Sequence, residues 1–534
     1  MLATLGLLAY PLTRVLLVPW WNPAPHGEFM AAPSLWSDLH FILSSGALRN
    51  SLMLATAAAL LATAGGAWLA WLTECTVLPG RPLITGALWL LLILPSYVMT
   101  LSWMALLAQL PAGSWLARAA PYVLGRPGIV LALALKNLPL VYLAVAPAWR
   151  QAGGAVDDAA SVHGLGGRAR LRIKLRLLAP ALLAGAVLAY AEALSDFGIA
   201  ATLGAGASIP LVPYAIYTAA GTLPVNFAVA ALYSWLLVGS ALIAVLLQRR
   251  LLANAARFEV RGVPRVRPNA VPGGAWLHTL LAIALLAVAL GIPIVSLAQG
   301  SLGPAGHRLE RYAQLWRGTD ALAALEFSVR WALWAATAAV IVGALLAAPL
   351  LRPRWQARAA DVLLAAAVAL PGLVLAVGYV FAYNQPGLPL YGTGLLLGSV
   401  YAALQLPLAT RLIVGRVAQL DPGLNDAARS LGIGSARRLL ALYLPVLGPA
   451  VLAAWIAACG RTLLELPASQ MLCPPGTQPL AVALTDLAAE FRYGREAALT
   501  VTALAAFALL WAVTRLLLGG ALPALWRWSL RHGT

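Results

Sequence analysis

Two segments of an otherwise apolar chain carry acidic, basic and small residues at matching positions. Residues 157–180 read DDAASVHGLGGRARLRIKLRLLAP, and residues 425–449 read NDAARSLGIGSARRLLALYLPVLGP. In each segment Asp-Ala-Ala is followed, after three residues, by a Gly that favours a left-handed helix end. In the second segment Asp421 would cap a helix that has Pro422 in its first turn. The pattern predicts a rigid helix, a glycine turn and a second helix, an arrangement suited to docking in a groove of another protein.

The residues assigned to this docking function are the Asp-Ala-Ala and Gly of both segments, and the Leu-Pro where the second segment enters the membrane. The small Ala and Gly residues among them indicate a close-packed contact that leaves no room for larger side chains. The alternative is a basic loop that lies on lipid headgroups, but one pattern found twice argues against it. The residues are Asp158, Ala159, Ala160, Gly164, Asp426, Ala427, Ala428, Gly432, Leu444 and Pro445.

The composition predicts a membrane protein around these segments. The chain has 534 residues, of which 61% are hydrophobic and only 10% charged, whereas soluble domains carry about 25% charged residues. A helical span needs about 20 mostly apolar residues. We expect an all-α polytopic membrane protein with about 12 transmembrane helices, near 2–19, 50–72, 84–108, 127–148, 179–200, 226–248, 276–298, 327–351, 361–383, 394–415, 446–468 and 497–519.

The chain reads as a tandem duplication. Asp158 and Asp426 are 268 positions apart, as are Gly164 and Gly432, and further upstream Ser51 pairs with Ser328 and Gly66 with Gly343. An even number of spans in each copy predicts two parallel six-helix repeats. We expect a first unit over 1–247 with its loop at about 150–178, a cytoplasmic linker over 248–274, and a second unit over 275–534 with its loop at about 418–445.

The net charge of +18 is interpreted as a topology signal rather than a nucleic-acid footprint. With the N-terminus inside, segments predicted to be cytoplasmic hold three times as many Arg and Lys residues as the outer segments. Both odd loops and both termini are then cytoplasmic, and membrane lipid is an expected partner. The first twenty residues lack a basic n-region, so we interpret them as a span and not as a removed signal peptide.

Four ionisable residues follow the loops at equivalent positions of the fifth span and are assigned to the translocation path. Glu192 and Arg461 lie 12 residues beyond Pro180 and Pro449, about 18 Å along a helix. Charged groups at such depth usually face the bundle interior and find a partner. We expect Glu192 to pair with Arg461, and Asp196 and Glu465 to form an acidic outer rim. In the alternative, Arg461 pairs with Glu465, four residues later on the same helix.

Several functions lack their motifs. The chain has no GxxxxGK[ST], so no P-loop ATP site is expected. No catalytic residue and no metal site are predicted, and His26, Glu28, Asp38 and His40 are interpreted as solvated loop residues. An ion-driven secondary transporter would also be built from repeats, and a membrane-embedded enzyme would need a carboxylate or His cluster. Neither alternative explains twin docking loops.

The loop pattern resembles that of bacterial ABC importer permeases, in which Glu-Ala-Ala, three residues and Gly are followed by nine residues, a hydrophobic residue, any residue and Leu-Pro. The second copy has Asp426 in place of Glu; the first is one residue short and has Arg176 where Pro is expected. The resemblance implies the type I permease fold, a bacterial inner-membrane location and no cofactor in this chain. It further implies that each loop is a coupling helix on a homodimeric ATPase, which holds ATP and Mg, and that a periplasmic or lipid-anchored binding protein delivers the substrate.

The segments LTECTVLPGRP (72–82), LPSYVMTLSWM (94–104), EALSDFGIAATLG (192–204) and LLELPASQMLCPPGTQPLAV (463–482) are similar to those of fused, two-unit ferric-iron permeases. Thiamine permeases look similar around Asp-Phe-Gly, whereas Glu-Leu-Pro-Ala at 465–468 favours iron. The resemblance therefore implies ferric iron as substrate, with thiamine, a polyamine or another small solute as alternatives.

Overall fold

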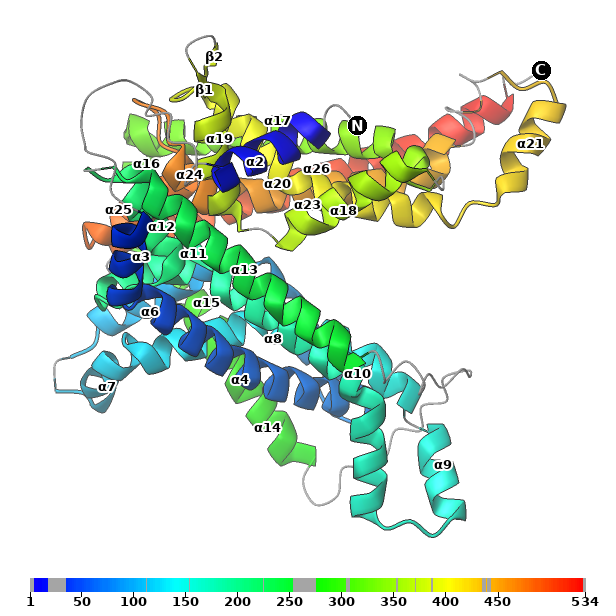
Figure 1. Ribbon diagram of the computed structural model, residues 1–534, viewed down its shortest axis with the longest axis horizontal. Helices are drawn as coiled ribbons and strands as arrows, with labels where there is room; N and C mark the ends of the chain where they lie inside the picture. The colour runs from blue at the N-terminus through cyan, green and yellow to red at the C-terminus, as the bar shows by residue number, and fades with distance from the viewer. Residues whose placement is uncertain are drawn as a thin grey trace. The chain divides into compact units, whose positions relative to one another are not determined.

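In the computed structural model the described part of the chain is almost entirely helical (Figure 1). The described residues are 4–17, 35–252 and 275–531, with gaps at 112, 153, 224, 304–307, 352–353, 370, 386–387, 435–437 and 439–442. The contacts divide the chain into two compact units, one made of Val18–Gln299 and the other of Met1–Leu17 with Gly300–Thr534. The predicted linker lies largely outside the described residues.

The unit Val18–Gln299, called unit A below, contains the first docking segment. Its elements are α3 (Leu35–Ser44), α4 (Ala47–Cys75), α5 (Arg81–Ile93), α6 (Ser96–Ala108), α7 (Trp115–Val123), α8 (Arg126–Ala152), α9 (Gly154–Val162), α10 (Gly167–Ser195), α11 (Phe197–Ile199), η2 (Ala200–Gly204), α12 (Val212–Gly221), α13 (Phe227–Leu252), α14 (Ala275–Leu286), η4 (Ala287–Gly291) and most of α15 (Ile292–Ser301).

The other unit, called unit B, contains the second docking segment. Its helical elements are η1 (Leu5–Ala9), α2 (Tyr10–Leu17), α16 (Glu310–Arg317), α17 (Thr319–Leu350), α18 (Trp355–Ala369), α19 (Gly372–Tyr383), α20 (Gly394–Val417), α21 (Pro422–Ser430), α23 (Leu444–Leu463), α24 (Pro467–Met471), α25 (Leu480–Ala489) and α26 (Tyr493–Arg531). Two two-residue strands, β1 (Asn384–Gln385) and β2 (Leu388–Pro389), form an antiparallel hairpin after α19.

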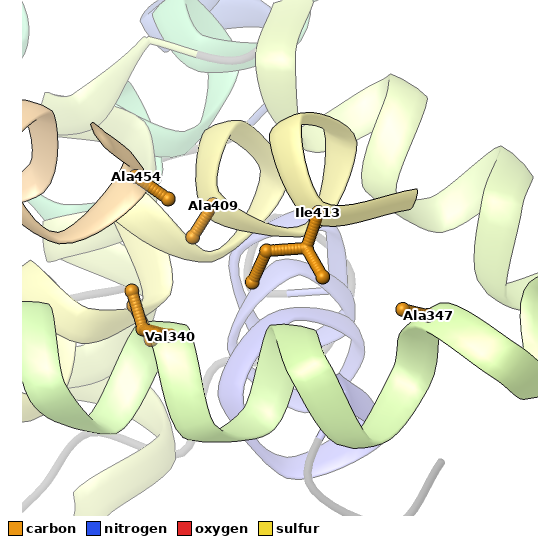
Figure 2. Close-up of a cluster of buried hydrophobic side chains, with 6 residues drawn as sticks. Val340, Ala347, Ala409, Ile413 and Ala454 are labelled. Carbon is orange, nitrogen blue, oxygen red and sulfur yellow. The ribbon is translucent and has the colours of Figure 1, made fainter. Parts of the chain in front are cut away.

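Each unit is built on the same three packed helices, α4, α8 and α10 in unit A and α17, α20 and α23 in unit B. Figure 2 shows the unit B core, where Val340 and Ala347 of α17 face Ala409 and Ile413 of α20 and Ala454 of α23. A Cβ on Gly66 would lie 2.7 Å from Val141, and one on Gly343 would lie 3.1 Å from Thr410. The two glycines thus let the first two core helices approach closely at equivalent places.

The serines paired by the duplication have the same partner in both units. The buried Ser51 Oγ accepts a hydrogen bond from the Val212 N–H at 2.8 Å, at the start of α12. The buried Ser328 Oγ accepts one from the Leu480 N–H at 2.7 Å, at the start of α25. A helix start leaves N–H groups without helical partners, and each serine satisfies one of them. The two serines that the sequence repeat pairs therefore accept equivalent hydrogen bonds.

Units A and B, which are defined by contacts, differ from the two units predicted from the sequence in where the first span of each half belongs. Tyr379 and Tyr383 of α19 donate hydrogen bonds to the carbonyls of Leu7 and Gly6, at 2.9 and 2.6 Å, so the N-terminal helices pack in unit B. Helices α14 and η4 pack on α5 in unit A. The division into 1–247, 248–274 and 275–534 stays a prediction about the repeat, while the packing exchanges the two leading helices.

The described parts of the predicted spans are largely helical, but not all of the spans are single helices, and the number of 12 stays a prediction. In the described ranges nine helices are long and apolar enough to cross a membrane. The predicted span 84–108 is wrong as one helix, because α5 and α6 meet at Leu94-Pro95 with a bend of 102°. Pro95 lacks the N–H that a continuous helix needs. The predicted span 361–383 is likewise divided between α18 and α19 before Pro371, and the span 2–19 is a shorter apolar helix at Gly6–Leu17.

Candidate functional site

The two docking segments end their first helices in the same way. Directly after α9, the N–H groups of residues 163, 164 and 165 donate to the carbonyls of residues 159, 161 and 160. Directly after α21, those of residues 431, 432 and 433 donate to the carbonyls of residues 427, 429 and 428. Every bond recurs at an offset of 268 residues. Gly164 and Gly432 have φ values of +64° and +70°, the left-handed conformation that closes a helix with a six-to-one bond. The predicted helix and glycine turn are confirmed in both halves.

The side chains of the motif share one exposure pattern. Asp158 and Ala159 are exposed in α9, as are Asp426 and Ala427 in α21. The third residue of each motif is buried: Ala160 is 3% exposed and Ala428 is 7% exposed. Each Asp-Ala pair therefore faces outward from a helix that the following alanine anchors.

The chain's own packing does not require the two glycines, because a Cβ built on Gly164 or Gly432 meets no atom within 4 Å in this chain. The close-packed contact expected at these residues is with a partner and stays a prediction. The positive φ, which L side chains rarely adopt, is what requires glycine. Any crowding at these positions has to come from a partner.

The return into the membrane differs between the two segments. Helix α10 runs unbroken from Gly167 to Ser195 and contains Arg176 at the place of the expected Pro. Helix α23 begins at Leu444 with Pro445 in its first turn, where a missing N–H costs no helical hydrogen bond. Residues 435–437 and 439–442, part of the second helical stretch predicted from about 435, lie outside the described residues.

A buried carboxylate fastens three helices beside α9. Glu74, near the end of α4, is 6% exposed. Its carboxylate pairs with Arg81 of α5 at 3.2 Å and with Arg150 of α8 at 3.0 Å. Arg150 lies four residues before α9 begins, so the ion pairs hold the root of the docking segment. Sequence reasoning missed this role, although an ionisable residue such as Glu74 near the end of an apolar span, with Arg81 close by in the sequence, indicates an ion pair.

Asp196 and Glu465 cap short helices at equivalent positions. The Asp196 carboxylate accepts hydrogen bonds from the Ile199 N–H at 2.7 Å and from the Ser96 hydroxyl at 2.9 Å. The Glu465 carboxylate accepts from the Ala468 N–H at 3.0 Å and the Ser469 N–H at 3.1 Å. These contacts explain the acidic residue that ends the fifth span in both halves. An acidic rim exposed to the path stays a prediction.

A lysine lies at the bend between α5 and α6. Lys136 Nζ donates to the Leu94 carbonyl at 2.7 Å and lies 3.4 Å from the carbonyl oxygens of Leu91 and Leu92. Lys136 is ten residues into the span Arg126–Arg150, about 15 Å from its start and so near mid-membrane. It also interacts electrostatically with Asp196. Sequence reasoning assigned it no role, although a lone Lys in an apolar span was the signal.

Glu192 and Arg461 are exposed side chains on α10 and α23. Because they belong to different units, their predicted pairing stays a prediction. The local alternative, Arg461 with Glu465, is not among the ion pairs of the described residues, but the two side chains interact electrostatically. Both pairings stay predictions.

The cross-half pair predicts charge-swap rescue. Glu192→Arg and Arg461→Glu should each lower uptake, because each change brings two like charges together. The double swap should recover part of the loss, because it restores opposite charges in reversed order. Uptake in membranes that contain equal amounts of each variant measures the effect. A double swap no better than the worse single variant would rule the pair out.

Two of the residues interpreted as solvated loop residues lie in a helix instead. Asp38 and His40 belong to α3, and Asp38 is only 5% exposed. A helix that packs on α13 and α4 removes Asp38 from water, which the isolated sequence did not indicate. His26 and Glu28 lie outside the described residues.

The comparison with known proteins points to one class of membrane protein. No family model matches the chain. The chain is 29% identical over 224 residues, 39% of its length, to a Sinorhizobium fredii protein named as a probable ABC transporter permease. It is 26% identical over 161 residues, 30% of its length, to the ferric transport system permease protein FbpB of Actinobacillus pleuropneumoniae. These matches span 38% and 23% of the two relatives.

A third relative is matched over more of its own length. The chain is 31% identical over 175 residues to the spermidine/putrescine transport system permease protein PotC of Haemophilus influenzae, which covers 31% of this chain and 67% of that protein. The relative is a permease subunit, as are the other two, and this chain has the apolar helices that such a subunit requires. The chain therefore belongs to the family of ABC importer permeases, membrane subunits that are not themselves enzymes.

Proposed function

We propose that the chain forms the whole translocation path of an ATP-driven importer, with α9 and α21 as its two coupling helices. Each helix docks on one subunit of a homodimeric ATPase that holds ATP and Mg, and a periplasmic or lipid-anchored binding protein delivers the substrate. Both termini lie in the cytoplasm of a bacterium, and the path crosses its inner membrane. The repeated helix end at Gly164 and Gly432 is the observation that carries the proposal.

The geometry suits force transfer because α9 is continuous with packed spans on both sides and α21 begins at a capped helix end. Helix α9 leaves the membrane beside the Glu74 ion pairs and returns through the 29-residue helix α10. Helix α21 is capped by Asp421, whose carboxylate accepts from the Gly423 N–H at 2.8 Å. A helix held in this way moves with the spans when a partner pushes it, whereas a floppy loop would absorb the motion.

Ferric iron is the proposed substrate. Support comes from the similarity to ferric transport permeases of two organisms and from the segments around Glu465. A polyamine is the second candidate, favoured by the spermidine/putrescine permease that is matched over 67% of its length. The substrate alternatives share the same coupling mechanism, so a single transport assay can separate them.

The test measures uptake into membrane vesicles of known orientation that contain the permease, its ATPase and its binding protein. We expect ATP-dependent accumulation of radioactive Fe³⁺ that a protonophore does not abolish and excess spermidine does not compete. Accumulation of labelled spermidine instead would make the polyamine the substrate. Uptake that a protonophore abolishes and ATP depletion spares would contradict the importer and favour an ion-driven transporter.

A further inference from the structure

Unit A contains a cavity of about 850 Å³ that none of the assigned roles uses. It lies between α3, α12, the start of α13 and the loop after η2. Within unit A these elements gather at the end remote from α9 (Figure 1). In the proposed topology this is the outer end, away from the ATPase. The volume falls in the range of about 300–1,000 Å³ that is typical of sites for small organic ligands.

A single buried carboxylate marks the wall of this cavity. Asp38 is 5% exposed, and its Oδ1 accepts one long hydrogen bond, from Asn226 Nδ2 at 3.5 Å. The amide oxygen of Asn226 is already used, because it accepts the Val229 N–H at 3.0 Å. No basic side chain of the described residues forms an ion pair with Asp38. Burial raises the pKa of the Asp38 carboxyl, and the bond from Asn226 offsets this only in part.

The rest of the lining combines aromatic rings and hydroxyl groups. Tyr214 contributes a ring that lies 5.9 Å from the ring of Tyr217. Thr218 and Thr222 add hydroxyl groups. A tyrosine ring attracts a cation through its face, and hydroxyl oxygens accept hydrogen bonds from an ammonium group.

We propose that this cavity is a binding site for an ammonium group, with Asp38 as its counter-ion. The ammonium donates to the Asp38 carboxylate and lies against Tyr214, while the carbon chain that carries it fills the apolar part of the cavity. Charge-assisted hydrogen bonds are about twice as strong as neutral ones, and here the bond also relieves a buried charge. The inference goes beyond the proposed function and holds whichever substrate is imported.

An organic ammonium fits the lining better than a bare metal ion does. A metal ion needs several oxygen, nitrogen or sulfur ligands at once. The described part of the chain has no group of three or more His, Cys, Asp or Glu residues that could hold one. Two sources supply the same chemistry at the outer membrane surface: a free amine, or the ethanolamine headgroup of a phospholipid.

The test uses a single Cys at Ser208, which is exposed and lines the cavity. Cys75, Cys459 and Cys473 are first replaced by Ser, and the full chain is placed in nanodiscs of phosphatidylcholine and phosphatidylglycerol. The rate of maleimide labelling is then measured with spermidine, with 1,8-octanediol as an uncharged probe, or with phosphatidylethanolamine in the nanodisc. At nine times the dissociation constant a bound amine should slow labelling about tenfold, by simple mass action.

The comparison variant is Asp38→Asn, which keeps the shape and removes the charge. We expect it to bind the amine at least about tenfold more weakly, because a charge-assisted bond is lost. Glu310→Gln, which removes an exposed carboxylate on α16, should leave the protection intact. Equal labelling of Asp38→Asn and its parent without ligand shows that the cavity is still formed.

Each result has one reading. Protection by spermidine alone assigns a free amine, protection by phosphatidylethanolamine alone assigns a lipid headgroup, and protection by both assigns the shared ammonium chemistry. Protection by octanediol equal to that by the amines, protection that survives Asp38→Asn, or no protection at all would overturn the proposal.

Discussion

Gly164→Glu and Gly432→Glu should each lower ATP-driven uptake by about tenfold or more without preventing insertion of the chain. Both glycines have positive φ, at +64° and +70°, and a residue with a Cβ in this conformation costs about 1–2 kcal/mol. A factor of ten corresponds to about 1.4 kcal/mol, so strain of this size shifts the equilibrium away from the correctly ended coupling helix by about tenfold. The new carboxylate adds a negative charge to a surface that has to contact the ATPase.

Matched controls separate backbone strain from charge. Gly166 has a φ of −68° and, like Gly434, has no atom within 4 Å of a built Cβ. Gly166→Glu and Gly434→Glu should therefore retain most of the uptake. Gly164→Asn and Gly432→Asn should also retain it, since Asn adopts the left-handed region more readily than other residues do. Uptake and co-purification of the ATPase are the measurements. Normal uptake in both Glu variants at 164 and 432 would refute the coupling role.

Much of the docking geometry could be predicted because it is local. A helix end closed by Gly depends on a few consecutive residues, so Gly164 and Gly432 were identified with their correct conformation. The offset of 268 residues also carried over to the hydrogen bonds. The physical cause is that a six-to-one bond and a positive φ involve no distant partner.

Features that depend on distant partners could not be predicted. The break at Leu94-Pro95 was not predicted, because hydropathy averaged over the length of a span changes little when one residue is a proline. The packing of the N-terminal helices on Tyr379 and Tyr383 joins residues more than 370 positions apart, which no periodicity encodes. Asp38 is buried where α3 packs on α13 and α4, and its partner Asn226 lies 188 positions away. Charged residues inside apolar segments were the missed signal common to Glu74 and Lys136.

Lys136→Leu is expected to lower uptake by about tenfold or more, an effect comparable to that of the glycine changes. The carbonyls at the end of α5 have lost their helical donors, because Pro95 interrupts the chain of N–H groups. The Lys136 ammonium replaces those donors at the carbonyls of Leu91, Leu92 and Leu94. A buried polar group left without a partner costs about 1–3 kcal/mol, and lipid offers no water to take its place.

The same change removes a cation that interacts electrostatically with Asp196. Asp196 keeps its bonds to Ile199 and Ser96, but its charge is no longer balanced. Lys136→Leu with Asp196→Asn should therefore be less harmful than the sum of the two single changes, which is the signature of a direct interaction. Lys136→Arg should retain part of the function, since it keeps the charge and the donors.

The duplication supplies the control for this experiment. Leu404 occupies the position equivalent to Lys136, 268 residues later, and lies against Gly372, which follows the Pro371 break of unit B. Leucine is thus compatible with the packing of such a break.

If Lys136→Leu fails only because a side chain of the wrong shape was introduced, Lys136→Met should restore uptake. If the ammonium is what matters, Met should be as damaging as Leu, Arg should be better than both, and the pairing with Asp196→Asn should show the positive coupling. The measurements are uptake per copy of inserted protein and the thermal unfolding temperature of each variant. Additive losses for Lys136→Leu and Asp196→Asn would exclude the interaction.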